Sequence, residues 1–181
     1  MDDRKLDNLI QENEIDKIIE YAKSLSGLNY NDFTDYLIKK LESTQIGTHR
    51  NTIAYILGEL KCNNAIEALV KLIFSPELKN NRGSFVYALN NLECGNWLVE
   101  LVPLLYEGNF EVRLNTYTLL ENKNKSMSTE DKEKSIKLLD KKIEEYEHIL
   151  GILYEVNNDF LKENSDTNCK NIFKKIFKKK N

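Results

Sequence analysis

His49 and His148 are the side chains in this sequence best suited to acid–base chemistry or metal binding near neutral pH. Neither has a second ligand at the spacing of a metal site, because Cys62 and Cys94 fall at the far ends of predicted helices, away from His49. We interpret both histidines as surface or helix-start residues. The sequence therefore predicts no metal and no cofactor.

Acidic residues are plentiful, but no pair of them stands apart as catalytic. Glu144, Glu145 and Glu147 lie among Lys141 and Lys142, which is typical of a solvated helix face. The sequence contains no Gly-rich phosphate loop, no Gly-x-Ser-x-Gly and no Cys-x-x-Cys. We predict no catalytic residues and expect a protein that is not an enzyme.

The stretch from Trp97 to Phe110 holds the most distinctive candidate binding residues. In the preceding repeat the positions of Val99 and Pro103 are taken by Glu67 and Lys71, a charged pair that should face water. An apolar face in place of a charged one is typical of a protein-binding hot spot. The alternative is that Trp97 and the following tyrosine pack against the next repeat. The predicted partner-binding residues are Trp97, Val99, Glu100, Pro103, Tyr106, Glu107 and Phe110.

The C-terminal segment from Lys170 to Asn181 is strongly basic, with six lysines and no acidic residue. Its apolar residues come in pairs that would share one side of a helix. Three interpretations stay open: a basic arm for a membrane surface or nucleic acid, a helix that packs its apolar side onto the acidic body, or a disordered tail. Packing onto the body is the one we favour, and lysine contact with a membrane surface would be weak.

The net charge of −3 is the sum of this basic segment and a more acidic remainder of the chain, the body. Without the six C-terminal lysines, 20 basic residues face 29 acidic ones, so the body carries a charge of −9. An acidic body repels phosphate backbones and attracts basic partners. We therefore expect a basic protein partner rather than nucleic acid.

No apolar run follows Met1, and no apolar stretch is long enough to span a bilayer. We expect a cytoplasmic protein that is a monomer when it has no partner. The sequence predicts two parts, a helical domain over residues 1–162 and a linker with a basic amphipathic helix or tail over residues 163–181.

A repeat of 32 residues sets the predicted architecture. It shows as columns of apolar residues: Ala22, Ala54 and Val86; Leu25, Leu57 and Leu89; Leu28, Leu60 and Leu92; and Leu37, Leu69 and Leu101. Such a period, apolar at helical spacing in both halves, is typical of a helical solenoid. Cys62 and Cys94 are also 32 residues apart, and stacked helices about 10 Å apart hold such positions too far apart for a disulfide.

The predicted helices follow the repeat. Asp32, Thr48 and Ser128 are predicted N-caps, and Gly27 with the Asn-rich residues 29–31 is predicted to form a turn. The expected ranges are 15–25, 32–41, 48–61, 64–74, 82–92, 96–107 and 111–122. A further helical pattern runs from residue 129 to about 162, as one helix or as two broken near Gly151.

The segment from Arg50 to Arg113 resembles the HEAT-repeat family, and within it the short bacterial HEAT-like repeats named after phycobilin lyases. The matching pattern includes His49-Arg50, Ala54 and Leu57-Gly58-Glu59-Leu60, and an arginine returns at Arg82 and Arg113. The resemblance implies an all-α, right-handed α-solenoid of three to four helix pairs with irregular terminal helices. It also implies that the arginines form a structural ladder and that the second helices line the concave side.

The resemblance names a fold and not a function. We predict a non-catalytic protein-binding module, either an immunity-type protein that neutralises a basic toxin or a small scaffold or adaptor. The alternative is a HEAT-like DNA-binding protein or alkylpurine-type DNA glycosylase. That class uses a basic concave groove, whereas here the second helices carry Glu67, Glu100 and Glu107.

Overall fold

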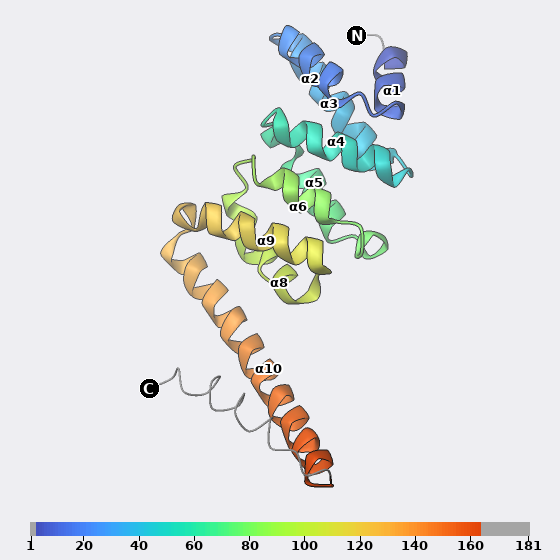
Figure 1. The fold of residues 1–181 in the computed structure, drawn as a ribbon. Helices are drawn as coiled ribbons and strands as arrows, with labels where there is room; N and C mark the ends of the chain where they lie inside the picture. Colours follow the sequence, from blue (N-terminus) through green and yellow to red (C-terminus); the bar gives the residue numbers. More distant parts are fainter. Residues whose placement is uncertain (1–2, 164–181) are drawn as a thin grey trace. The chain divides into compact units, whose positions relative to one another are not determined.

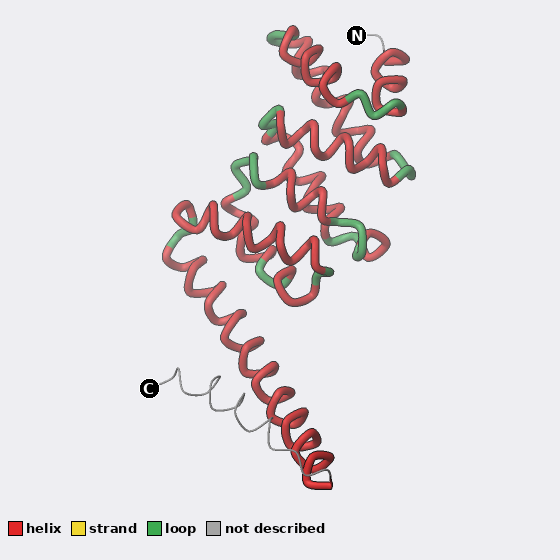
Figure 2. Tube along the Cα trace, viewed as in Figure 1, coloured by secondary structure: helices red, strands yellow, loops and turns green. Residues whose placement is uncertain are grey.

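The computed structural model describes residues 3–163, and within this range the chain forms helices and loops with no strand. The α-helices are α1 (Asp3–Gln11), α2 (Ile15–Ser24), α3 (Leu28–Ser43), α4 (Gly47–Glu59), α5 (Ile66–Ile73), α6 (Gly83–Leu89), α7 (Leu98–Leu101), α8 (Leu104–Glu107), α9 (Phe110–Lys123) and α10 (Thr129–Glu163). Short 3₁₀ turns are η1 (Asn63–Ala65), η2 (Pro76–Leu78), η3 (Gly95–Trp97) and η4 (Asn124–Ser126). The described chain is all-α, as the sequence predicts (Figure 2).

Two compact units divide the chain, Met1–Ile136 (unit 1) and Lys137–Asn181 (unit 2), with the division inside α10. The domain boundary that the sequence predicts at residue 162 lies at the edge of the described residues and stays a prediction. The basic segment Lys170–Asn181 lies outside them. None of the described helices is both long and apolar enough to span a bilayer.

In unit 1 the helices pack as successive hairpins. Helices α2, α4, α6 and α9 contact one another in that order, and α3, α5 and α8 pack against α4, α6 and α9 respectively (Figure 1). Each second helix therefore packs against the first helix that follows it in the chain. This arrangement places residues one repeat apart beside each other.

Hydrogen bonds between successive first helices follow the repeat. Asn91 Nδ2 donates to Glu59 Oε1 over 3.1 Å, and Asn115 Nδ2 donates to the Gly83 carbonyl over 3.0 Å. Both pairs are 32 residues apart, so the sequence period is the register of the stack.

The core of unit 1 contains most of the predicted columns, including Ala54, Leu57, Leu69, Leu89 and Leu101. Three column members depart from this pattern: Leu25 and Leu60 are half-buried, and Leu28 is exposed. Gly27 adopts a left-handed conformation (φ +56°), and α3 starts directly after it. This turn carries Leu28 away from the core.

Two predicted helix starts were wrong. Helix α3 begins at Leu28, so the Asn-rich residues 29–31 are helical and Asp32 is not its N-cap. Helix α4 begins at Gly47, one residue before the predicted cap Thr48, and no side chain caps it. In both places the helix begins before the polar residue that could have capped it.

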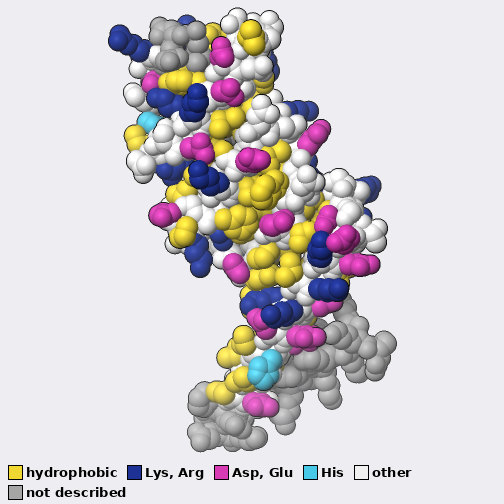
Figure 3. Space-filling model, turned by 180° about the vertical axis from the view of Figure 1, so that it is seen from behind, with side chains coloured by type: hydrophobic (Ala, Val, Ile, Leu, Met, Phe, Trp, Pro, Cys, Tyr) yellow, Lys and Arg dark blue, Asp and Glu magenta, His cyan; other side chains and the backbone are white. Residues whose placement is uncertain are grey.

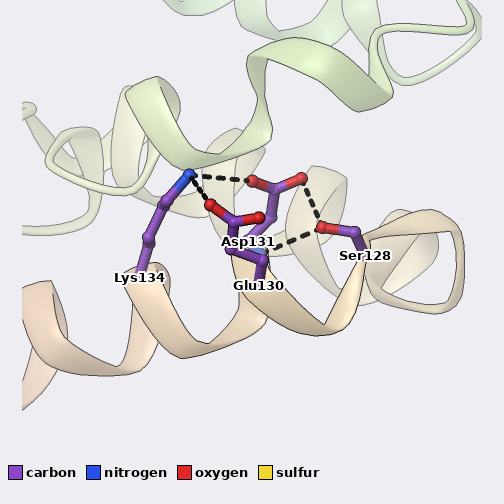
Figure 4. A network of polar contacts seen from close by, with 4 residues as sticks. All are labelled: Ser128, Glu130, Asp131 and Lys134. Carbon is purple, nitrogen blue, oxygen red and sulfur yellow. Dashed lines mark hydrogen bonds and ion pairs between the residues drawn. The ribbon is translucent and has the colours of Figure 1, made fainter.

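The start of α10 matches its predicted cap. Ser128 Oγ accepts a hydrogen bond from the Asp131 amide (3.0 Å) and donates to Asp131 Oδ2 (2.8 Å), while Lys134 pairs with Glu130 at 2.8 Å (Figure 4). Acidic side chains in this first turn also favour the helix dipole. The helix then continues to Glu163 without a break at Gly151, which settles the choice between one helix and two.

The surface of unit 1 is not uniformly polar. Figure 3 shows hydrophobic side chains gathered in a band on the side turned away from the view of Figure 1, between acidic and basic side chains. When a partner covers such an apolar band, water leaves it at a low cost in free energy.

Candidate functional site

The predicted aromatic stripe (Trp97, Val99, Pro103, Tyr106 and Phe110) does not lie on one continuous helix. Trp97 ends η3, Val99 is on α7, and Pro103 stands between α7 and α8. Proline has no amide hydrogen to donate, and the helix predicted over residues 96–107 breaks around it. The stripe is therefore divided among three short elements and the first residue of α9.

The stripe residues differ in exposure. Trp97, Val99, Pro103 and Tyr106 are half-buried, and Trp97 packs against the hydrophobic core. Phe110 is 76 % exposed, and the neighbouring Glu100 and Glu107 are exposed. Packing is thus the principal role of Trp97 in this structure, whereas Phe110 is available to a partner.

Phe110 belongs to a second apolar surface, the α9 face, which also includes Leu114 and Tyr117. These two side chains are 52 % and 56 % exposed, and the spacing i, i+4, i+7 aligns the three on one side of α9. The opposite side of the helix buries Val112 and Leu119. Asn109 fixes the start of the helix, because its Oδ1 accepts a hydrogen bond from the Val112 amide (3.0 Å).

Sequence reasoning missed Leu114 and Tyr117, although a signal for them was present. They follow Phe110 at helical spacing, and α9 already has enough other apolar residues to contact the core. The next helix pair of the repeat pattern does not follow α9. A first helix without a successor leaves its outward face uncovered.

Acidic side chains lie near both ends of α9. Glu107 and Glu111 are exposed at the end of α8 and the start of α9, and Glu121 Oε1 accepts a hydrogen bond from the Tyr117 hydroxyl (3.3 Å). Arg113 is the basic residue that shares this end of α9, and it is exposed too. An apolar centre with a mainly acidic rim suits a partner that presents apolar and basic side chains.

The three repeat arginines lie in two kinds of environment. Arg50 and Arg82 are buried, and each donates to a carbonyl at the C-terminal end of the preceding helix: Arg50 to Thr44, and Arg82 Nη1 to Ile73 over 3.1 Å. Arg113 is exposed, and its guanidinium group makes no hydrogen bond to another described residue. The predicted ladder thus has two buried members in this structure, and the third residue lies at the surface.

Burial leaves parts of both guanidinium groups without partners. Arg50 Nε and Arg82 Nε and Nη2 are buried and make no hydrogen bond within the described residues. Burial lowers the pKa of Arg82, an effect that the charge of Glu107 opposes. A polar hollow of about 440 Å³ adjoins Arg50 and is lined also by Gln45, Asn51, Asn81, Ser84 and Glu111.

The two histidines lie on different helices of the described chain. His49 is half-buried in the first turn of α4, and His148 is exposed on α10. Residues 3–163 contain no group of histidine, cysteine and carboxylate side chains that could hold a metal ion. Cys62 and Cys94 are buried free thiols, and burial raises the pKa of each.

Comparison with known proteins adds no relative: no family model matches the chain, and neither a curated protein nor a solved structure matches it.

Proposed function

We propose that this protein is a non-catalytic protein-binding module built on a right-handed, HEAT-like solenoid of three to four helix pairs. The order of helix contacts in unit 1 and the 32-residue register of its hydrogen bonds support the solenoid. The fold by itself carries no activity. The function therefore depends on the side chains that the surface presents.

The observation that carries the proposal is the α9 face. Phe110, Leu114 and Tyr117 expose three large side chains on one side of a single helix. Rigid apolar residues that line one helix face, with a charged rim, are the usual form of an interface hot spot. The α9 face replaces the aromatic stripe as the proposed contact surface, and Phe110 is common to both.

The charge of the protein selects the class of partner. Glu121 borders the α9 face through its contact with Tyr117, Glu107 and Glu111 are exposed near the start of α9, and the body without its C-terminal lysines carries −9. Such a surface attracts a basic protein and accelerates its association. An immunity-type protein that covers the active surface of a cationic toxin fits this description, and a small scaffold or adaptor is the less specific form of the same proposal.

A HEAT-like DNA-binding protein or alkylpurine-type glycosylase is the weaker candidate. The second helices carry exposed Glu67, Glu100 and Glu107, and Lys71 on α5 pairs with Glu42 at 3.2 Å. Trp97, the side chain best suited to stack on a base, packs against the core. The exposed glutamates disfavour binding of a phosphate backbone.

The experiment is capture of the partner from the native source, followed by titration of the purified pair. We expect a basic protein, and affinity that falls as salt is added. Leu114→Ala and Tyr117→Ala should each weaken binding by about 2 kcal/mol, roughly thirtyfold in the dissociation constant.

Phe74→Ala is the matched control, because Phe74 is a large exposed apolar residue that lies at the end of α5 and outside the α9 face. It should leave the affinity unchanged. Equal binding by all the variants, or capture of an acidic protein or a nucleic acid, would contradict the proposal. Capture by a chain truncated after Lys162 tests the C-terminal segment separately, and we expect it to persist.

A further inference from the structure

Unit 2 presents apolar side chains along α10 to solvent. Helix α10 is 35 residues long, and in its unit 2 part Ile143, Leu150 and Leu153 are all exposed. A helical pattern much longer than about 25 residues is more typical of a coiled coil than of a helix on a globular core. The apolar residues of α10 therefore call for a partner helix.

The spacing of these residues has the period of a coiled coil. Leu139, Ile143, Tyr146, Leu150, Leu153 and Asn157 are separated alternately by four and three residues. We name these six residues the α10 seam. The alternation averages 3.5 residues per turn, which keeps one stripe against a partner helix only if the two helices wind around each other. In this register Ile143, Leu150 and Asn157 occupy position a, and the other three occupy position d.

Position a also indicates what kind of partner fits. A single asparagine among apolar a positions pairs best with the same asparagine of a parallel, in-register partner, at some cost in stability. Asn157 is such a residue. It selects a second copy of this chain over an unrelated apolar helix.

The flanking charges agree with a parallel pair. Lys142 occupies position g and Glu147 position e of the next heptad, so each lysine would lie opposite the partner's glutamate. Within one chain Lys142 contacts Glu145, 2.5 Å away, and lies over the Tyr146 ring. Of these two residues, Tyr146 belongs to the seam, so this contact places the ammonium group beside it.

We propose that α10 mediates self-association of this protein as a parallel two-stranded coiled coil between two copies of the chain. A dimer differs from the monomer that is predicted from the sequence. That prediction rests on the helical pattern of these residues and does not use their heptad register. The proposal is independent of the α9 face and of any basic partner.

Sedimentation equilibrium of the full-length protein tests the association. The 21.1 kDa chain should give a concentration-dependent mass that approaches twice this value. Leu150→Glu at position a should return the mass to that of a monomer. Ile152→Glu is the matched control, because Ile152 is 48 % exposed and Leu150 47 %, yet Ile152 occupies position c outside the seam.

Cysteine cross-linking tests the orientation. In a chain carrying Cys169→Ser, Ile143→Cys should form a disulfide-linked dimer on mild oxidation, because position a faces its own copy in a parallel pair. Ile152→Cys should not. Helix content measured by circular dichroism should be the same in all the variants.

Three outcomes would overturn the proposal. One is a full-length protein that stays monomeric. This includes a chain that dimerises only after residues 164–181 are removed, because that result would mean that the basic segment blocks the seam in the full-length protein. Another is a dimer that survives Leu150→Glu. The third is failure of Ile143→Cys to cross-link, which would exclude the parallel register.

Discussion

Tyr55 and Tyr87 stack face to face, with ring centroids 5.9 Å apart and planes inclined by 10°. They are 32 residues apart and occupy the same position on α4 and α6. The charge of Glu59 raises the pKa of Tyr55, and the neighbouring Tyr87 raises it further. A residue of one repeat therefore lies beside its own equivalent in the next, and a change at one such position acts on the contact between repeats.

These two helices approach each other closely at Gly58. A Cβ atom at this position would lie 3.0 Å from the Ala88 Cα and 3.1 Å from the Ala88 carbonyl oxygen. We predict that Gly58→Leu lowers the free energy of unfolding by about 2 kcal/mol or more, because α4 and α6 must separate to admit the side chain. Urea denaturation measures the change.

Gly151→Ala provides the opposite case. Nothing lies within 4 Å of a Cβ built on Gly151, in the exposed part of α10. Alanine should stabilise this helix by about 0.5–1 kcal/mol through helix propensity alone. If Gly58→Leu left stability unchanged, the close packing of α4 on α6 would be refuted.

The stacking of hairpins could be predicted from the sequence because a repeat constrains each column several times over. Leu57 and Leu89 support each other as evidence for a core position, and both are buried. Positions at the ends of the stack have a neighbour on one side alone. Leu114 lies on the last of the first helices in the repeat pattern and is exposed, and periodicity cannot reveal which repeat is the last.

The candidate site was harder to predict than the fold. Trp97 and Phe110 follow the same apolar pattern, but the break at Pro103 and the packing of Trp97 into the core separate them. Whether an aromatic side chain fills a gap or faces water depends on the helix packed against it. That information is tertiary and is absent from local spacing.

Trp97 and Phe110 should respond oppositely to truncation. Trp97→Ala should lower the free energy of unfolding by about 2–3 kcal/mol, because it removes a large half-buried ring from the core. Phe110→Ala should change stability by less than about 0.5 kcal/mol and should weaken partner binding. Thermal melts and binding titrations of the same two variants measure these effects. If Trp97 were the binding anchor, Trp97→Ala would be the variant that weakens partner binding.

Arg82 and Arg113 make a second contrasting pair. Arg82→Ala should destabilise the protein by about 2 kcal/mol, since the Ile73 carbonyl loses its donor and a buried side chain is removed. Arg82→Met should cost less, because it keeps the volume and removes a buried charge with two unpaired nitrogens.

Arg113→Ala should stay within about 0.5 kcal/mol of the parent protein, as exposed substitutions usually do. Chemical denaturation of the three variants measures the series. An Arg113→Ala variant as unstable as Arg82→Ala would indicate that all three arginines form one ladder.

Asp7 attaches α1 to α3, and its contribution should depend on pH. Its Oδ1 accepts from the Tyr36 hydroxyl (2.6 Å) and its Oδ2 from Lys40 Nζ (2.9 Å). Burial alone would raise the pKa of Asp7, but hydrogen bonds from Lys40 and Tyr36 outweigh it and lower that pKa below 3.8. The carboxylate is therefore more acidic in the folded protein than in the unfolded chain.

A folded-state pKa below the unfolded value stabilises the fold above the unfolded pKa, and the stabilisation is lost as the pH falls through the folded one. Asp7→Asn should thus cost about 0.5–1 kcal/mol at neutral pH, a modest value because the pair is about one third exposed. The difference between the parent protein and the variant should shrink as the pH falls below the unfolded-state pKa of Asp7 and should vanish below its folded-state pKa. Hydrogen exchange of the α1 amides measures it, with Tyr36→Phe expected to reproduce part of the loss; a difference that persisted in acid would show that the effect comes from the shape of the side chain and not from its charge.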